Sequence, residues 1–292
     1  MEELAPKLFD YTDAFSRNIG FLSREEQSVI KSKTIAVPGM GGVGGHHLHT
    51  LVRLGFEKFH IADFDEFDVH NFNRQIGAKM STVGRQKADV MRDMIKDINP
   101  NAQIKVFSEG VNESNYDEFL KGIDILVDGL DIFAIKPRLE LFAKADQLNI
   151  PIVTAAPLGM GTSLLAFDPK KMGASEYFNI DRSLSTEELM IRFLVGVAPK
   201  LMHDSYMIRK EVDIFKGRVP SLHVGCLAAT SALGSIVLKI ALDRGDVIYA
   251  PHGFHVDFYL NKYKYFWRPF GNKNPLQKLA IAYLKRKFAQ SV

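Results

Sequence analysis

Apolar runs and stretches with helical spacing alternate along residues 34–168. The apolar runs predict strands at residues 34–39, 58–63, 103–107, 124–128 and 151–156. The stretches between them predict helices at residues 43–54, 83–98, 116–120 and 134–148. Strands that alternate with helices indicate βαβ units and a parallel sheet, and nearly continuous apolar strands indicate burial on both faces. We therefore predict an α/β fold, a Rossmann-like doubly wound sheet that is mostly parallel.

The pattern changes after residue 162. Residues 169–222 are irregular apart from a short helical piece near residues 186–194, and an irregular segment of this length is more often functional than idle. The other predicted elements are a strand, a long apolar helix, aromatic-rich antiparallel strands and an amphipathic basic helix, at residues 162–167, 222–242, 247–267 and 275–288. We therefore predict one domain in two halves. Residues 1–168 hold an N-terminal arm and the regular alternation, and residues 169–292 hold the crossover segment and the C-terminal elements.

The composition is that of an ordinary globular chain, with 292 residues, 46% of them hydrophobic, 24% charged, and a net charge of +3. A charge this small does not favour nucleic acid or a membrane surface as a partner. The single cysteine, Cys226, excludes an intrachain disulfide and a zinc site of four thiolates. Residues 1–10 carry acids and no apolar core, and no apolar run approaches the roughly 20 residues that span a bilayer. We expect a cytoplasmic protein.

A glycine-rich sequence follows the first predicted strand and opens the first helix. It reads Gly39-Met40-Gly41-Gly42-Val43-Gly44. Glycines permit a tight turn and a close approach of the backbone to phosphates, and the helix N-terminus adds free N–H groups and a positive dipole. Asp63, 19 residues after Gly44 at the end of the second strand, suits a ribose hydroxyl. The combination predicts a site for a dinucleotide or an adenosine nucleotide.

Four polar residues downstream distinguish a triphosphate from a dinucleotide. Asn71 and Arg74 follow the second strand, Lys87 stands at the start of the next helix, and Asp131 closes the fourth strand. Because the carboxyl ends of neighbouring strands share one crevice in such a sheet, we expect these residues around the glycine loop. A triphosphate requires cations at its oxygens and an acid that holds Mg²⁺, whereas the NAD pyrophosphate requires neither. ATP and Mg²⁺ are therefore the predicted cofactors of the first half.

The motifs of this half resemble those of the ThiF/MoeB/ubiquitin-activating superfamily. They are G-x-G-G-x-G, then D-x-D-x-x-x-x-x-N-x-x-R-Q from Asp63 to Gln75, a helix lysine, and an aspartate after the fourth strand. The resemblance is strong from about Arg17 to Asp168. It implies an enzyme that transfers AMP from ATP to a carboxylate on a partner molecule.

The resemblance also implies roles for the matching residues. The implied contacts of the phosphates are Gly39, Gly41, Gly42, Gly44, Asn71, Arg74, Gln75 and Lys87. Asp63 would hold the ribose and Asp131 would bind Mg²⁺. Arg17, within Phe15-Ser16-Arg17-Asn18, would enter the active site of a partner subunit in a homodimer. Asp65 matches the second acid of the motif, and no role follows for it.

Some features depart from the family pattern. Pro38 lies at the end of the first strand, Ile132 follows Asp131, and Arg138 stands two places later than the family's downstream arginine. These departures concern the acceptor side of the site. Many family members carry zinc-binding cysteine pairs or a catalytic cysteine in the crossover segment, but residues 169–222 contain no cysteine. We therefore expect no zinc site and no enzyme thioester.

The remaining candidate residues have simpler interpretations. Cys226 lies within an apolar helix, where a free cysteine usually packs in the core. His46, His47 and His49 begin the first helix without a third metal ligand in a suitable pattern, so packing or solvent contact is the preferred interpretation.

We therefore predict an ATP- and Mg²⁺-dependent adenylyltransferase. Its acceptor would be the C-terminus of a ubiquitin-like or sulfur-carrier protein or peptide, or a carboxylate on a small molecule or a tRNA base. Two alternatives stay open at this point. One is an NAD-dependent oxidoreductase in which Asp63 holds the adenosine ribose, and the other is a dimeric scaffold that binds a nucleotide without catalysis.

Overall fold

One sheet of eight strands runs through the protein, in the order β3-β2-β1-β4-β5-β6-β7-β8. The computed structural model describes residues 8–181, 183–212 and 219–289, so parts of the predicted N-terminal arm, crossover segment and C-terminal tail lie outside the described residues. The strands are β1 (Thr34–Pro38), β2 (Lys58–Ala62), β3 (Gln103–Phe107), β4 (Ile125–Asp128), β5 (Ile152–Leu158), β6 (Gly161–Phe167), β7 (His252–Asp257) and β8 (Lys262–Trp267). Strands β1 to β5 are parallel, and β6 to β8 continue the sheet in antiparallel pairing. The predicted mostly parallel α/β sheet is confirmed.

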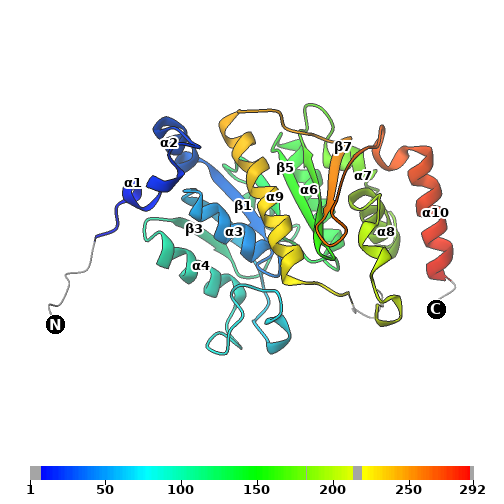
Figure 1. The fold of residues 1–292 in the computed structure, drawn as a ribbon, viewed down its shortest axis with the longest axis horizontal. Helices are drawn as coiled ribbons and strands as arrows, with labels where there is room; N and C mark the ends of the chain where they lie inside the picture. The colour runs from blue at the N-terminus through cyan, green and yellow to red at the C-terminus, as the bar shows by residue number, and fades with distance from the viewer. Residues whose placement is uncertain (1–7, 182, 213–218, 290–292) are drawn as a thin grey trace.

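Helices cover both faces of this sheet (Figure 1). One face carries α2 (Arg24–Ser32), α3 (Gly44–Arg53), α4 (Lys87–Ile98) and α9 (His223–Leu242). The opposite face carries α5 (Tyr116–Phe119), α6 (Ile135–Gln147), α7 (Ala174–Phe178) and α8 (Thr186–Val197). Each face has its own apolar core, which explains why the central strands are apolar at consecutive positions.

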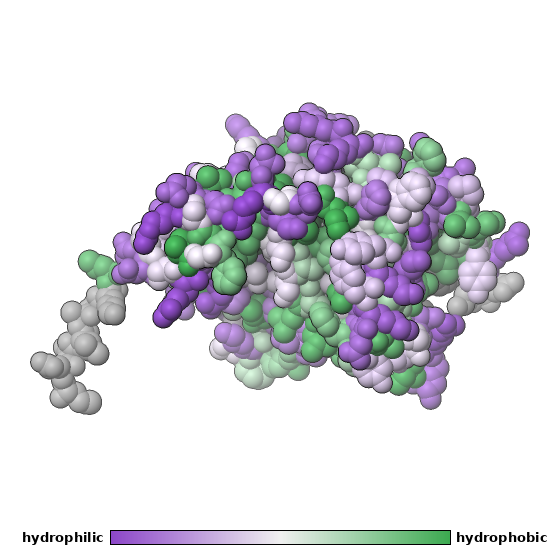
Figure 2. Space-filling model, turned by 45° about the horizontal axis from the view of Figure 1, so that its top comes forward, coloured by the Kyte–Doolittle hydropathy of each residue, from purple (hydrophilic) through white to green (hydrophobic). Residues whose placement is uncertain are grey.

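The long helix α9 is the one helix of the described residues that is long and apolar enough to cross a membrane, by length and composition alone. This differs from the expectation that no apolar run reaches that length. In the fold α9 lies across β5 and β6 and beside α3, and 56% of its most apolar window is buried. A core helix passes the same composition test. On the face drawn in Figure 2, hydrophobic residues are interspersed with hydrophilic ones.

The crossover segment is more ordered than its sequence indicates. It contains α7, α8 and the short 3-10 helices η3 (Met202–Ser205) and η4 (Arg209–Glu211). Helix α8 extends three residues beyond the predicted end and packs against α10 (Pro275–Ala289) through Ile191, Val195 and Ile281.

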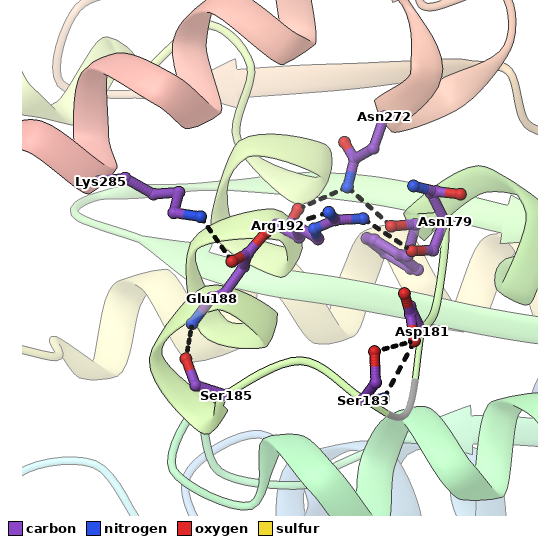
Figure 3. A network of polar contacts seen from close by, with 9 residues as sticks. Asn179, Asp181, Ser183, Ser185, Glu188, Arg192, Asn272 and Lys285 are labelled. Carbon is purple, nitrogen blue, oxygen red and sulfur yellow. Dashed lines mark hydrogen bonds and ion pairs between the residues drawn. The ribbon is translucent and has the colours of Figure 1, made fainter.

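A polar network fixes the same region (Figure 3). Arg192 donates hydrogen bonds to the Asn179 carbonyl and to Glu188, both at 3.0 Å, and Lys285 of α10 pairs with the second oxygen of Glu188. The Asn272 amide donates to the carbonyls of Phe178 and Arg192. The contacts of Asn272 and Lys285 join residues 80 to 97 positions apart, so a local sequence pattern cannot show them.

One predicted helix boundary is wrong. The helix expected at residues 83–98 begins at Lys87. Val83 forms a bridge with Phe67 and Gln86 forms one with Glu66, and Gly84 has φ +78°. Residues 83–86 therefore form a loop that pairs with residues 66–67, so the helix cannot start before Lys87.

Candidate nucleotide-binding site

The loop between β1 and α3 is packed backbone to backbone against the loop after β4. Gly39 has φ +85°, and a Cβ there would lie 2.4 Å from the carbonyl oxygen of Gly129. A Cβ on Gly44 would lie 1.8 Å from the Gly39 oxygen and 3.2 Å from Gly129 Cα. Larger residues would force these loops apart. Val43, the N-cap of α3, makes no side-chain capping bond, and of the first three N–H groups of the helix only that of Gly45 has a backbone acceptor within the ranges that the structure describes, the Gly41 carbonyl.

Asp63 connects the glycine loop to the end of β2. Its Oδ2 accepts the Met40 N–H at 2.6 Å, and its Oδ1 accepts the Asp65 N–H at 2.8 Å. Burial raises the pKa of Asp63, while these N–H groups and the Lys87 charge oppose that shift. A carboxylate oxygen accepts more than one hydrogen bond, so Asp63 can still receive a ribose hydroxyl. Asp63 directly follows β2, as expected, and its role towards a ribose stays a prediction.

Asp65 holds Lys87, which gives the unassigned acid of the motif a structural role. Lys87 Nζ lies 2.8 Å from Asp65 Oδ2, and the Lys87 N–H donates to the Asp65 carbonyl, also at 2.8 Å. The Lys87 side chain is 8% exposed and that of Asp65 53% exposed. An ammonium group has three protons, so the ion pair leaves donors for a phosphate.

The turn formed by residues 71–75 lies beside the glycine loop. The N–H groups of Arg74 and Gln75 both donate to the Asn71 carbonyl. The Asn71 side chain accepts the Asp68 N–H at 3.0 Å, which caps the preceding 3-10 helix η2 (Val69–Asn71). The aliphatic part of Arg74 would lie 3.6 Å from a Cβ on Gly42. Gln75 Nε2 would lie 3.8 Å from a Cβ on Gly41, and its buried Oε1 has no partner among the described residues. This unmet acceptor beside the loop fits a ligand-binding position.

Asp131 follows the loop that packs against the glycine loop, but it does not close the fourth strand, which ends at Asp128. Asp131 lies two residues after Gly129, which packs against Gly39 and Gly44 of the glycine loop. The exposed carboxylate accepts the Phe133 N–H through Oδ1 at 3.0 Å. No group of three or more His, Cys, Asp or Glu side chains suited to a metal occurs within the described ranges. Mg²⁺ commonly takes one or two carboxylates together with phosphate oxygens, so Asp131 fits a metal that arrives with ATP.

Arg138 does not reach the crevice. Its Nε lies 3.1 Å from both oxygens of Asp128, it donates to the Leu130 carbonyl, and its guanidinium stacks on the Phe193 ring at 4.5 Å. Thr154 completes the group by donating to Asp128 at 2.7 Å. Arg138, which stands two places later than the family's downstream arginine, is therefore a buried residue that fixes the loop between β4 and Asp131. A sequence offers no signal for this pairing across β4, β5 and α6.

Arg17 lies away from the glycine loop of its own chain. It is exposed in the 3-10 helix η1 (Ser16–Asn18). The neighbouring Asn18 donates to the Leu54 carbonyl at 3.1 Å, at the C-terminal end of α3. Since the glycine loop begins α3 and the helix has 10 residues, about 15 Å of helix separates the two ends. The structure does not bring Arg17 to the other predicted residues.

The expected packing of Cys226 and the helix histidines is confirmed for the buried members. Cys226, His46 and His47 are at most 3% exposed, while His49 is half-buried. Burial raises the pKa of the Cys226 thiol, which disfavours the nucleophilic thiolate. His47 Nδ1 lies 2.9 Å from the Thr230 hydroxyl, which ties α3 to α9.

The fold and site together define a doubly wound α/β protein with cations and an exposed acid near a glycine loop that follows the first strand. The chain belongs to the ThiF family, which matches residues 15–274. This confirms the resemblance drawn from the motifs. One relative, tRNA threonylcarbamoyladenosine dehydratase of Bacillus subtilis (strain 168), is 34% identical over 142 residues, covering 48% of this chain and 55% of the relative.

Solved structures with the same fold include nucleotide complexes. E. coli MccB with ATP has a TM-score of 0.64 at 17% identity, covering 88% of this chain and 71% of that one. E. coli TcdA, the tRNA N6-threonylcarbamoyladenosine dehydratase, in complex with AMP has a TM-score of 0.58 at 22% identity, covering 82% and 98%. At these identities the likeness shows the fold. The chain spans about half the length of the curated relatives that it matches.

Proposed function

We propose that this protein uses ATP and Mg²⁺ to adenylate a carboxylate of an acceptor molecule. The observation that carries the proposal is the buried Lys87, which Asp65 holds near the glycine loop. The side chain of Arg74 packs against Gly42 of the same loop. A fixed ammonium and a guanidinium next to uncapped helix N–H groups suit a polyphosphate. Family membership supports the same ligand, and the MccB and TcdA structures hold ATP and AMP.

The chemistry follows from charge. The acceptor carboxylate is ionised near pH 7, so no general base is required. One of its oxygens attacks the α-phosphorus, the bond from that phosphorus to the bridging oxygen breaks, and pyrophosphate leaves with the electron pair. The products are an acyl-adenylate and pyrophosphate. Catalysis then consists of positioning two anions and stabilising the charge on the leaving group.

The residues divide this work by position. The N–H groups of α3 face the phosphates, Lys87 and Arg74 place positive charge beside them, and Asp63 orients the ribose. Asp131 is the residue that would hold Mg²⁺, which would neutralise phosphate charge when bound.

The acceptor is a separate proposal. We favour the C-terminus of a ubiquitin-like or sulfur-carrier protein or peptide, as the motif resemblance implies. The name of the Bacillus subtilis relative makes a carboxylate on tRNA the other candidate, although the net charge of +3 gave no reason to expect nucleic acid. We further propose a cytoplasmic location, because the chain has one cysteine and no disulfide framework.

Two measurements test the proposal. Thermal melting with ATP and Mg²⁺ should show stabilisation, and NAD under the same conditions should not. Protection by NAD alone would favour the oxidoreductase alternative. Release of pyrophosphate should then require an acceptor, tested with a ubiquitin-like carrier protein and with bulk tRNA as separate additions. Binding of ATP without release in either arm would favour the non-catalytic scaffold.

We also propose a homodimer in which Arg17 serves the partner's site, because Arg17 lies far from its own glycine loop. Arg17→Ala and Asp131→Ala homodimers should both lack activity. In a mixed dimer one site carries both defects and the other neither, so equal mixing should restore about a quarter of wild-type activity. No recovery with mixed dimers present would show that Arg17 acts within its own chain or not at all.

A further inference from the structure

The turn that carries Arg74 is tied to the start of α9, a contact that the proposed chemistry does not require. We call residues 221–226, where the crossover segment enters α9, the α9 junction. Asn73 donates to the Ser221 carbonyl of this junction at 2.9 Å. The guanidinium of Arg74 in turn donates to the Asn73 side-chain oxygen at 2.9 Å and to the His70 carbonyl at 3.2 Å. Asn73 therefore bonds the junction with one end of its amide and Arg74 with the other.

His46 holds the same turn from the opposite side. It lies in the first turn of α3 and is 3% exposed. Its Nε2 lies 3.1 Å from the Arg74 carbonyl oxygen, and its ring meets that of His223 edge to face at a centroid distance of 5.0 Å. Burial lowers the pKa of His46, which keeps the ring neutral with one N–H. A carbonyl oxygen cannot donate, so in this hydrogen bond Nε2 carries the proton of the neutral ring.

The glycine loop completes the arrangement. A Cβ on Gly42 would lie 3.5 Å from Cys226 Sγ and 3.6 Å from Arg74 Cγ, so Gly42 lies between the junction and Arg74. Three separate contacts thus connect the α9 junction to the phosphate-binding elements, through Asn73, through His46 and through Gly42. The His46 contact is partly buried, so breaking it would leave the Arg74 carbonyl without this donor, whereas the hydrogen bonds of Asn73 are exposed.

We propose that His46 and Asn73 are positioning residues, which hold Arg74 over the glycine loop by tying the 71–75 turn to α3 and to the α9 junction. The inference rests on the proposed function, since it makes Arg74 a phosphate ligand. It extends the proposed function, because the end of the crossover segment would help to position a residue that binds the nucleotide. A displacement of about 1 Å in such a group can cost roughly 100-fold in productive binding or rate.

The test measures binding of ATP with Mg²⁺ by titration calorimetry, which requires no acceptor. His46→Leu should raise the Kd for ATP about 10- to 100-fold. His46→Gln keeps an N–H near the Nε2 position and should restore most of the affinity. The matched control is His47→Leu, also buried in α3, which loses the Thr230 contact but does not touch the turn, and its Kd should equal that of wild type. If His46→Leu does not fold, Asn73→Ala, an exposed substitution, takes its place and should raise the Kd in the same way.

A double-mutant cycle separates positioning from general destabilisation. In the Arg74→Ala background the guanidinium is absent, so adding His46→Leu or Asn73→Ala should change the Kd no further. Additive losses in the cycle, equal losses in His47→Leu, or no rescue by His46→Gln would overturn the inference while leaving the proposed function intact. Failure of the wild-type protein to bind ATP with Mg²⁺ would overturn both.

Discussion

The ion pair between Asp65 and Lys87 offers a direct test of how the site handles charge. Asp65→Asn removes the carboxylate while keeping the shape and one acceptor oxygen. In the free protein, this leaves the ammonium of Lys87, 8% exposed, beside a neutral amide. Breaking a fully buried pair costs about 3–5 kcal/mol, and an exposed pair contributes about 0–1 kcal/mol. Because Asp65 is 53% exposed and admits water to the site, we expect a loss of about 2 kcal/mol.

Bound ATP should reverse part of this loss, because the triphosphate returns negative charge to Lys87. A difference of about 2 kcal/mol corresponds to roughly 3 °C in melting temperature for a chain of 292 residues. Without nucleotide, Asp65→Asn should melt that much below wild type, and ATP with Mg²⁺ should stabilise it by more than it stabilises wild type. Lys87→Met should show the opposite, with little stabilisation by ATP. Differential scanning fluorimetry with and without nucleotide measures both. Equal ATP shifts in wild type and both variants would refute the reasoning, since Lys87 would not face the phosphates.

Other substitutions test separate parts of the site and fold. Asp131→Ala alters an exposed side chain and should change unfolding free energy by less than about 0.5 kcal/mol, but the added thermal protection that Mg²⁺ gives to bound ATP should disappear. Cys226→Ala should leave ATP affinity within about twofold of wild type, and mass spectrometry should find no covalent acceptor adduct on the wild-type thiol, which is buried with a raised pKa. Burial lowers the pKa of His47 to about 3, and the unfolded value is about 6.5. The unfolded chain thus binds the extra proton, so stability present above pH 6.5 should fall towards pH 5, by about 2 kcal/mol for this group. His47→Leu should flatten that part of a denaturation series across pH, and an unchanged slope would contradict the assignment.

The sequence alone was sufficient to place the candidate residues that lie directly at the ends of strands or the starts of helices. The glycine loop, Asp63 and Lys87 follow strand ends or begin helices, so the order of elements placed them at one edge of the sheet. The sequence analysis assigned Gly39 and Gly44 to a tight turn and to the approach of phosphates, and it did not predict their packing against Gly129.

Contacts between distant segments were not predictable in this way. Arg138 matched the family arginine only loosely, and its pairing with Asp128 and Thr154 depends on how α6 packs against β4 and β5. The helix boundary at Lys87 depends on bridges between residues 66–67 and 83–86. His46 looked like one of three helix histidines, and only the approach of the 71–75 turn distinguishes it from His49. Each of these outcomes is decided by a partner that the local pattern does not contain.

The three acids of the site raise a physical question, since carboxylates beside a triphosphate would repel it. The structure answers it by giving each acid a different partner. Both oxygens of Asp63 accept main-chain N–H groups, and Asp65 is paired with Lys87. Asp131 bonds one N–H through Oδ1, and Oδ2 carries no partner in the described part of the chain. Among the three acids, Asp131 is the exposed one that has no cation or pair of N–H groups on its carboxylate among the residues that the structure describes, so a divalent cation bound with ATP could take it, whereas Lys87 already balances the charge of Asp65. This division makes the substitutions above distinguishable, because only Asp131 should couple to Mg²⁺ and only Asp65 should couple to Lys87.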